Sequence, residues 1–328
     1  MLFSHSSNAA AKEDDKLHLL IYETESAVDS PAFNLLRQTE HLDSVEAQIF
    51  GSGSAFEGYG SKYSTVYPVL ESLDPDAVVV ISDGRDVLLN NPARSADDDS
   101  IVQAFRAGYE RLTHQKTGAV VVSAEAQCCV SALTHIAPGD LFRNDGSRKA
   151  YACASGTEGC LWNGDDSARP WESFMAEEAL TRTESPEYDD VYLNAGLIVG
   201  KAKDLIELID ALKIDDSEDD QAVLTDYMYH NGDKIVLDYS QSIFGNNRGG
   251  VMGDEQDGCV FSVQDESLSL RLTHEKTGTS PLFVHSPGGF TKCHDELATQ
   301  LGLDAVALTA RRRLGRKDEK ECNYKSCS

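Results

Sequence analysis

Short runs of consecutive apolar residues alternate along the chain with longer stretches whose apolar residues recur every three or four positions. The clearest run is Val78-Val79-Val80-Ile81. Its shortness and its β-branched side chains predict a strand that is buried on both faces, as in the centre of an α/β sheet. Comparable runs predict further strands at 17–22, 47–50, 118–123, 235–238 and 281–285.

The stretches with helical spacing fall between these runs. Residues 101–113 place Val102, Phe105, Tyr109 and Leu112 on one face, and this spacing predicts a helix. Further helices are expected at 31–40, 201–213 and 217–230, and another after the glycine-rich residues 51–60, where Pro68 weakens the prediction. Alternating strands and helices indicate βαβ units, and therefore an α/β fold with a mainly parallel sheet flanked by helices.

The regular pattern breaks between residues 131 and 188. This stretch is rich in Gly, Asp and Ser and holds both tryptophans, so we expect a long loop-rich insertion. Regularity returns at 191–200, and residues 240–250 are expected to form a loop. We expect a disordered tail at 1–16, one domain at 17–305 and a basic tail with a cysteine pair at 306–328.

Two carboxylates follow the central strand directly. Asp83 and Asp86 flank Gly84 and Arg85, and a second apolar run begins at Val87. Ligands of parallel sheets bind at the carboxyl ends of strands, and hard oxygen ligands suit Mg²⁺ or Mn²⁺. A polar turn that closes a core strand is the alternative, because Asp and Gly are ordinary turn residues.

Two other predicted strands also end in residues of types that commonly bind metals or sugars. Glu125 follows the strand at 118–123, and His285 ends the strand at 281–285. If these strands share one parallel sheet, the side chains lie along one edge. Gly288, Gly289 and Lys292 follow His285 and suit a diphosphate. The alternatives are a surface carboxylate for Glu125 and a hydrogen-bonded core histidine for His285.

An acidic run and a single amide are the remaining candidates for chemistry. The run at 215–220 contains more acids than a helix N-terminus needs, and a carboxylate there can accept a proton or stabilise a cationic sugar. Asn194 lies in an apolar segment, so its amide requires partners. It can bind a sugar hydroxyl or hold a turn.

The amino-acid composition indicates which binding partners and which cellular compartment to expect. The net charge of −26, from 29 basic and 55 acidic residues, argues against nucleic-acid binding. The eight cysteines include the closely spaced pairs Cys153/Cys160 and Cys322/Cys327, which permit small disulfide loops and favour the ER/Golgi lumen or secretory pathway. A cytoplasmic location stays open, because the chain begins without a signal peptide and has no membrane span.

The ordered set of motifs resembles a known family. The motifs are I-S-D-G-R-D-V-L, V-V-S-A-E, Y-L-N-A-G-L-I-V-G, D-D-Q, L-D-Y-S-Q-S-I-F and F-V-H-S-P-G-G-F-T-K. In this order they resemble the glycosyltransferase domain of the procollagen lysyl hydroxylases and related collagen-type glycosyltransferases, over residues 17 to 298. The resemblance implies a GT-A type fold, a UDP-sugar donor and Mn²⁺.

The resemblance also implies roles for individual residues. The expected metal ligands are Asp83, Asp86 and His285. Residues near the nucleotide and its diphosphate would be Lys62, Glu125, Gln221, Gly288 and Lys292. Residues facing the sugar and the acceptor would be Asn194, Asp219 and Asp220. Two departures stand out: Arg85 replaces an aromatic residue, and the insertion at 131–188 is longer than its counterpart.

The leading hypothesis is a metal-dependent hexosyltransferase that acts on a protein or glycan hydroxyl. One alternative is a non-catalytic sugar-nucleotide or glycan-binding relative, which a complete metal set argues against. Another is an aspartyl phosphatase, whose chemistry requires D-x-D spacing where Asp83 and Asp86 give D-x-x-D.

Overall fold

The structure is a computed structural model. It describes residues 16–25, 31–40, 42–90, 98–114, 116–126, 136–152, 168–182, 190–247, 259–266, 269–287 and 291–302. The predicted basic tail, the cysteine pairs proposed from spacing, Gly288 and all but the last residue of the predicted N-terminal tail lie outside these ranges.

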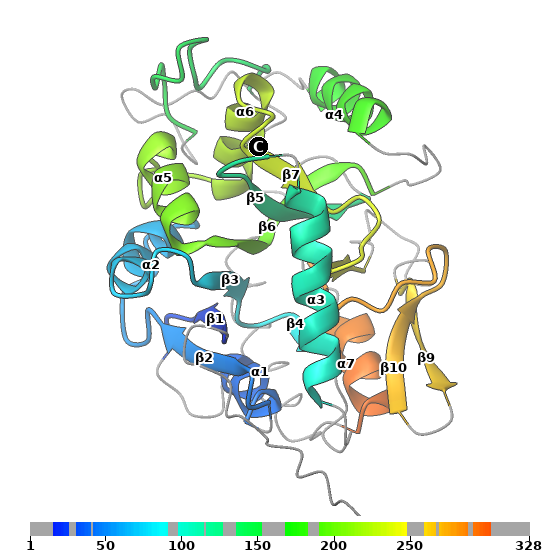
Figure 1. Ribbon diagram of the computed structural model, residues 1–328. Helices are drawn as coiled ribbons and strands as arrows, with labels where there is room; N and C mark the ends of the chain where they lie inside the picture. Colours follow the sequence, from blue (N-terminus) through cyan, green and yellow to red (C-terminus); the bar gives the residue numbers. More distant parts are fainter. Residues whose placement is uncertain are drawn as a thin grey trace, which may run out of the picture.

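A six-stranded mixed sheet forms the centre of the structure (Figure 1). Its strands are β1 (Leu17–Tyr22), β2 (Val45–Phe50), β3 (Val78–Asp83), β5 (Val120–Glu125), β6 (Tyr192–Lys201) and β7 (Ile235–Leu237), in the order β2-β1-β3-β6-β5-β7. Only β6 is reversed, because it pairs antiparallel with both β3 and β5 while the other pairs are parallel. The predicted mainly parallel α/β sheet is confirmed.

Helices cover both faces of this sheet. One face packs against α2 (Ser61–Glu71), α4 (Ala168–Arg182), α5 (Ala202–Leu212) and α6 (Asp220–His230). The other packs against α1 (Pro31–Gln38) and α3 (Asp98–Thr113). Strand β1 shows why its run is apolar throughout: Leu19 and Ile21 face α1 and α3, Leu20 faces α2, and all three are fully buried.

A second, three-stranded sheet lies beside the first. It consists of β4 (Val87–Leu89), β11 (Phe283–His285) and β8 (Phe244–Asn246), with β11 in the middle, antiparallel to β4 and parallel to β8. Two predictions are therefore wrong: the strand that ends in His285 does not belong to the main sheet, and residues 240–250 contain a strand. Pairing between segments this distant in sequence leaves no local signal.

The C-terminal part of the described chain packs on this second sheet. A hairpin of β9 (Phe261–Glu266) and β10 (Ser269–His274) and the helix α7 (Thr291–Gln300) bury apolar residues against β4 and β11. A disulfide joins Cys259 to Cys293 and so ties the start of β9 to α7. No helix in the described part of the chain combines the length and apolar character of a membrane span.

The insertion is not wholly irregular. It contains α4, in which Trp171, Met175 and Ala179 recur every four residues and are buried. Glutamates and arginines fill many of the other positions, so the apolar stripe is too narrow to stand out in the sequence. The Trp171 indole N–H donates to the carbonyl of Ile136, which joins α4 to the described segment 136–152.

Candidate functional site

The loop between β3 and β4 carries both aspartates. Asp83 is the last residue of β3, and Asp86 immediately precedes β4. Gly84 lets the loop pass close to its neighbours, because a Cβ atom there would lie 2.6 Å from the carbonyl oxygen of Tyr22 and 2.8 Å from the Cβ of Ala32. A larger residue would displace the loop and the two carboxylates with it.

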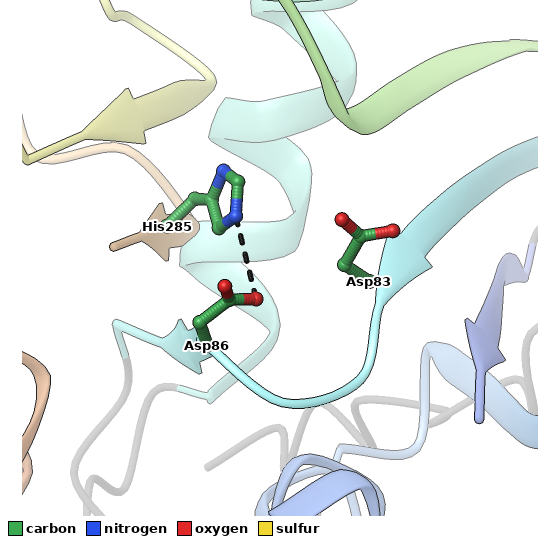
Figure 2. A group of neighbouring side chains, drawn as sticks. All are labelled: Asp83, Asp86 and His285. Carbon is green, nitrogen blue, oxygen red and sulfur yellow. Dashed lines mark ion pairs between the residues drawn. The ribbon is translucent and has the colours of Figure 1, made fainter. Parts of the chain in front are cut away.

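His285 reaches the aspartates through the second sheet. Strand pairing places it opposite Val87, and the backbone N–H of Ser286 donates to the carbonyl of Asp86 at 2.8 Å. The His285 Nε2 atom lies 3.3 Å from Asp86 Oδ1. Figure 2 shows the imidazole and both carboxylates turned toward one another, and one ligand atom from each lies within 4.8 Å of the others.

Asn246 sets the orientation of this imidazole. Its Nδ2 donates to the carbonyl of Ala124 at 2.7 Å, so its Oδ1 faces His285 Nδ1 at 2.9 Å. An amide oxygen only accepts, and Nδ1 must therefore carry the proton. The lone pair of Nε2 is left for the space between the carboxylates, which is how a neighbouring group usually orients a metal-binding histidine.

This donor set suits a divalent cation. Two carboxylates and one imidazole are ligands that Mn²⁺ and Mg²⁺ accept while keeping positions for water or phosphate. Burial lowers the pKa of His285, but the negative charge of Asp86, Asp83 and Glu125 raises it overall. The site therefore attracts positive charge, either as a proton on His285 or as a metal ion.

Lys62 links this cluster to the acidic helix α6. Its side chain is 4% exposed, and its Nζ lies 3.0 Å from Asp83 Oδ1, 2.8 Å from Asp220 Oδ2 and 2.9 Å from the carbonyl oxygen of Ala195. Burial lowers the pKa of Lys62, but Asp220 and Asp83 raise it well above its ordinary value. The lysine is therefore charged and bridges two predicted site residues.

The neighbouring acids Asp219 and Asp220 differ in their surroundings. Asp220 is buried and also accepts from the Tyr63 hydroxyl at 3.3 Å. Asp219 is the N-cap of α6, where its Oδ1 accepts from the backbone N–H of Ala222 at 2.9 Å. Burial and the charge of Asp220 raise the pKa of Asp219 to about 7. Asp219 is partly exposed, whereas Asp220 is buried, so of the two only Asp219 reaches the surface.

Glu125, Gln221 and Asn194 form a buried polar group beside His285. Gln221 Nε2 donates to Glu125 Oε1 at 2.8 Å, and the Asn194 side chain also bonds to Glu125. Burial raises the pKa of Glu125 to about 7 in spite of these bonds. In β6, Gly196 leaves room for the imidazole, because a Cβ atom there would lie 2.4 Å from His285 Cε1.

Replacing Glu125 by Gln should stabilise the protein at high pH only. The folded state holds a proton on Glu125 up to pH 7, whereas the unfolded carboxyl releases it near pH 4, so stability falls as pH rises between these values. The amide mimics the neutral acid. Urea unfolding should show similar stability at pH 4 and an advantage for Glu125→Gln of about 3 kcal/mol at pH 8. An advantage of equal size at both pH values would contradict the raised pKa.

Arg85, which stands where the family has an aromatic residue, forms ion pairs with two glutamates. Its guanidinium bonds to Glu23 twice, at 2.9 and 3.2 Å, and lies 3.3 Å from Glu25. Glu23 follows β1 and is buried. The ion pair therefore fixes the loop between β3 and β4 to the end of β1, a contact that the sequence spacing could not indicate.

The insertion is anchored to α6 and the residues before it by two buried carboxylates. Asp226 accepts from the backbone N–H groups of Gly139, Leu141 and Phe142 at 2.7 to 3.1 Å. Glu218 accepts from the N–H of Ala152 at 2.7 Å and forms a buried ion pair with Arg148. The described residues 136–152 of the insertion thus pack next to Asp219 and Asp220, and neither anchor is predicted from the sequence.

The structure brings together most of the residues predicted for the site. Asp83, Asp86, His285 and Lys62 form one contiguous group, and Asp220 joins it through Lys62. Glu125, Gln221 and Asn194 form the adjacent polar group. Lys292 lies in the first turn of α7, and Gly288 is outside the described residues. The roles of all these residues remain predictions.

Comparisons with known proteins give one match to a family. Residues 177–300 match the family model of the PLOD GT domain. A search of curated proteins found no match.

Three solved structures show distant likenesses to the chain. The apo structure of the bifunctional glycosyltransferase WbbM has 12% identity and a TM-score of 0.43, covering 91% of this chain and 52% of its own. An active-site mutant of LgtC has 11% identity and a TM-score of 0.33, covering 83% and 87%. Mannose-6-phosphate isomerase from Helicobacter pylori has 8% identity and a TM-score of 0.28, covering 60% and 74%. We draw nothing about this chain from likenesses this distant.

The chain spans about half the length of the WbbM chain, 52%. The family match itself includes β6, α5, α6 and His285, and so covers much of the candidate site. Over residues 177–300 the chain matches the PLOD glycosyltransferase domain, which confirms the family resemblance inferred from its motifs.

Proposed function

We propose that this chain is a metal-dependent glycosyltransferase of GT-A type that transfers a hexose from a UDP-sugar to a hydroxyl group of a protein or glycan. The observation that carries the proposal is the convergence of Asp83, at the end of β3 in the main sheet, with Asp86 and the oriented Nε2 of His285 from the second sheet. The family match over residues 177–300 supports glycosyl transfer as the reaction.

The proposed chemistry divides the site into two halves. A bound Mn²⁺ or Mg²⁺ would neutralise the diphosphate and stabilise the charge that develops on the leaving UDP. Asp83, Asp86 and His285 would hold that ion. On the other side of Lys62, the buried Asp220 carboxylate would supply negative charge behind the sugar. Asp219, whose pKa is about 7, would take the proton of the acceptor hydroxyl.

The net charge and the disulfide support particular proposals for the acceptor and the compartment. A net charge of −26 favours neutral or basic acceptors and disfavours nucleic acid. The Cys259–Cys293 disulfide fits an oxidising compartment, in agreement with the proposed ER/Golgi lumen or secretory pathway.

A UDP-release screen tests the proposed reaction without knowledge of the acceptor. The purified chain is incubated with Mn²⁺ and a panel of UDP-sugars, and released UDP is measured, since slow donor hydrolysis requires only water. We expect release from one sugar well above the others, and its loss in EDTA. If no sugar gave UDP release in protein that still binds UDP, the result would contradict the enzyme hypothesis and favour a non-catalytic sugar-nucleotide-binding protein.

A further inference from the structure

Lys62 occupies a position that the proposed chemistry leaves unexplained. Its buried ammonium contacts one metal-binding carboxylate, Asp83, and one carboxylate outside the metal site, Asp220, at nearly equal distances of 3.0 and 2.8 Å. The carbonyl oxygen of Ala195 completes the contacts at 2.9 Å. The three partners come from β3, α6 and β6, so Lys62 is held from three sides.

A divalent ion and this ammonium cannot both bind Asp83 at full strength. Two positive charges a few ångströms apart on one carboxylate repel each other, and the burial of Lys62 limits how far water screens that repulsion. Asp220 offers Lys62 a second carboxylate at which to remain paired. When the ion replaces Lys62 at Asp83, the ammonium therefore stays paired with Asp220. A buried charge without a partner would be strongly destabilising.

We propose that Lys62 is the resident counter-cation of Asp83, which competes with the divalent ion for that carboxylate and is retained by Asp220 when the ion binds. The inference rests on the proposed metal site. Lys62 then lowers the intrinsic metal affinity, keeps the carboxylates compatible with folding before the ion binds, and couples metal loading to the position of Asp220.

Three variants separate competition at Asp83 from the general electrostatic field. Lys62→Met removes the competitor together with one positive charge. Asp220→Asn removes the alternative partner, so that Lys62 pairs with Asp83 alone. The double variant Lys62→Met/Asp220→Asn has the same net charge as the wild type, lacks the competitor and leaves no unpaired carboxylate at position 220. Lys203→Met, on the exposed end of α5, is the control for loss of a distant charge.

Mn²⁺ alone is titrated into each protein, by calorimetry or by electron paramagnetic resonance of free Mn²⁺. We expect affinity to rise roughly tenfold in Lys62→Met and in the double variant, and to fall roughly tenfold in Asp220→Asn. Thermal unfolding confirms that each variant is folded; if Lys62→Met is not, the double variant decides.

The outcomes distinguish this inference from the proposed function. If the double variant bound Mn²⁺ no more tightly than the wild type, the proposed competition at Asp83 would be contradicted, but the proposed metal site would not. If the wild type bound no Mn²⁺, the proposed metal site itself would be contradicted. The Lys203→Met control should match the wild type in either case.

Discussion

Asp86→Ala should lose the metal-dependent part of nucleotide binding. The substitution removes one of the three side chains proposed to hold the metal, and its carboxylate lies 3.3 Å from His285 Nε2. Loss of a group that merely supports a metal ligand already lowers metal affinity by about 10–100-fold, so the loss of a ligand should cost on the order of 100-fold or more. In Mn²⁺, the variant should bind UDP no better than the wild type does in EDTA, as measured by calorimetry.

A matched control exists at the opposite end of the same strand. Asp76 precedes β3, is exposed and pairs only with surface lysines, Lys201 and Lys203, among its described ion pairs. Asp76→Ala removes one carboxylate without touching the candidate site, and its UDP titration should match the wild type. Equal UDP affinity for wild type and Asp86→Ala in Mn²⁺ would contradict the metal assignment.

Asp226→Asn should release the insertion from α6. The carboxylate of Asp226 is fully buried and accepts three backbone N–H groups. An amide has one accepting atom, so at least one of the three N–H groups loses its acceptor and faces another donor. We expect a loss of about 3 kcal/mol in urea unfolding, and faster hydrogen exchange at Gly139, Leu141 and Phe142.

Asp145→Asn provides the comparison within the insertion. Asp145 is exposed and bonds only locally to Ser147 in the described structure. Its replacement should change stability by less than about 0.5 kcal/mol. If Asp226→Asn behaved like this control, Asp226 would not anchor the insertion. If it were destabilised without faster exchange at residues 139–142, the anchor would lie elsewhere.

The features that the sequence predicted well are those with a local pattern. The run at Val78-Val79-Val80-Ile81 is apolar because both faces of β3 are covered. The position of Asp83 and Asp86 after that run then follows from where a strand ends. His285 is expected near the aspartates from its position at a strand end, and the family resemblance then assigns it as a metal ligand and adds Lys62.

The features that the sequence did not predict depend on contacts between distant segments. His285 reaches Asp86 because β11 pairs with β4, roughly two hundred residues away, and not because it shares the main sheet. Asn246 orients His285 from β8, a strand too short and too polar at its end to be recognised. The Asp226 anchor joins backbone groups, whose hydrogen-bond partners carry no sequence signature.

The most direct test of the central claim is a titration of UDP into the wild-type protein, in Mn²⁺ and in EDTA. The claim is that Asp83, Asp86 and His285 form a metal site that holds the diphosphate of a sugar nucleotide. It predicts saturable UDP binding in Mn²⁺ that weakens by on the order of 100-fold in EDTA. Equal UDP affinity in the two buffers, or no binding in either, would contradict it.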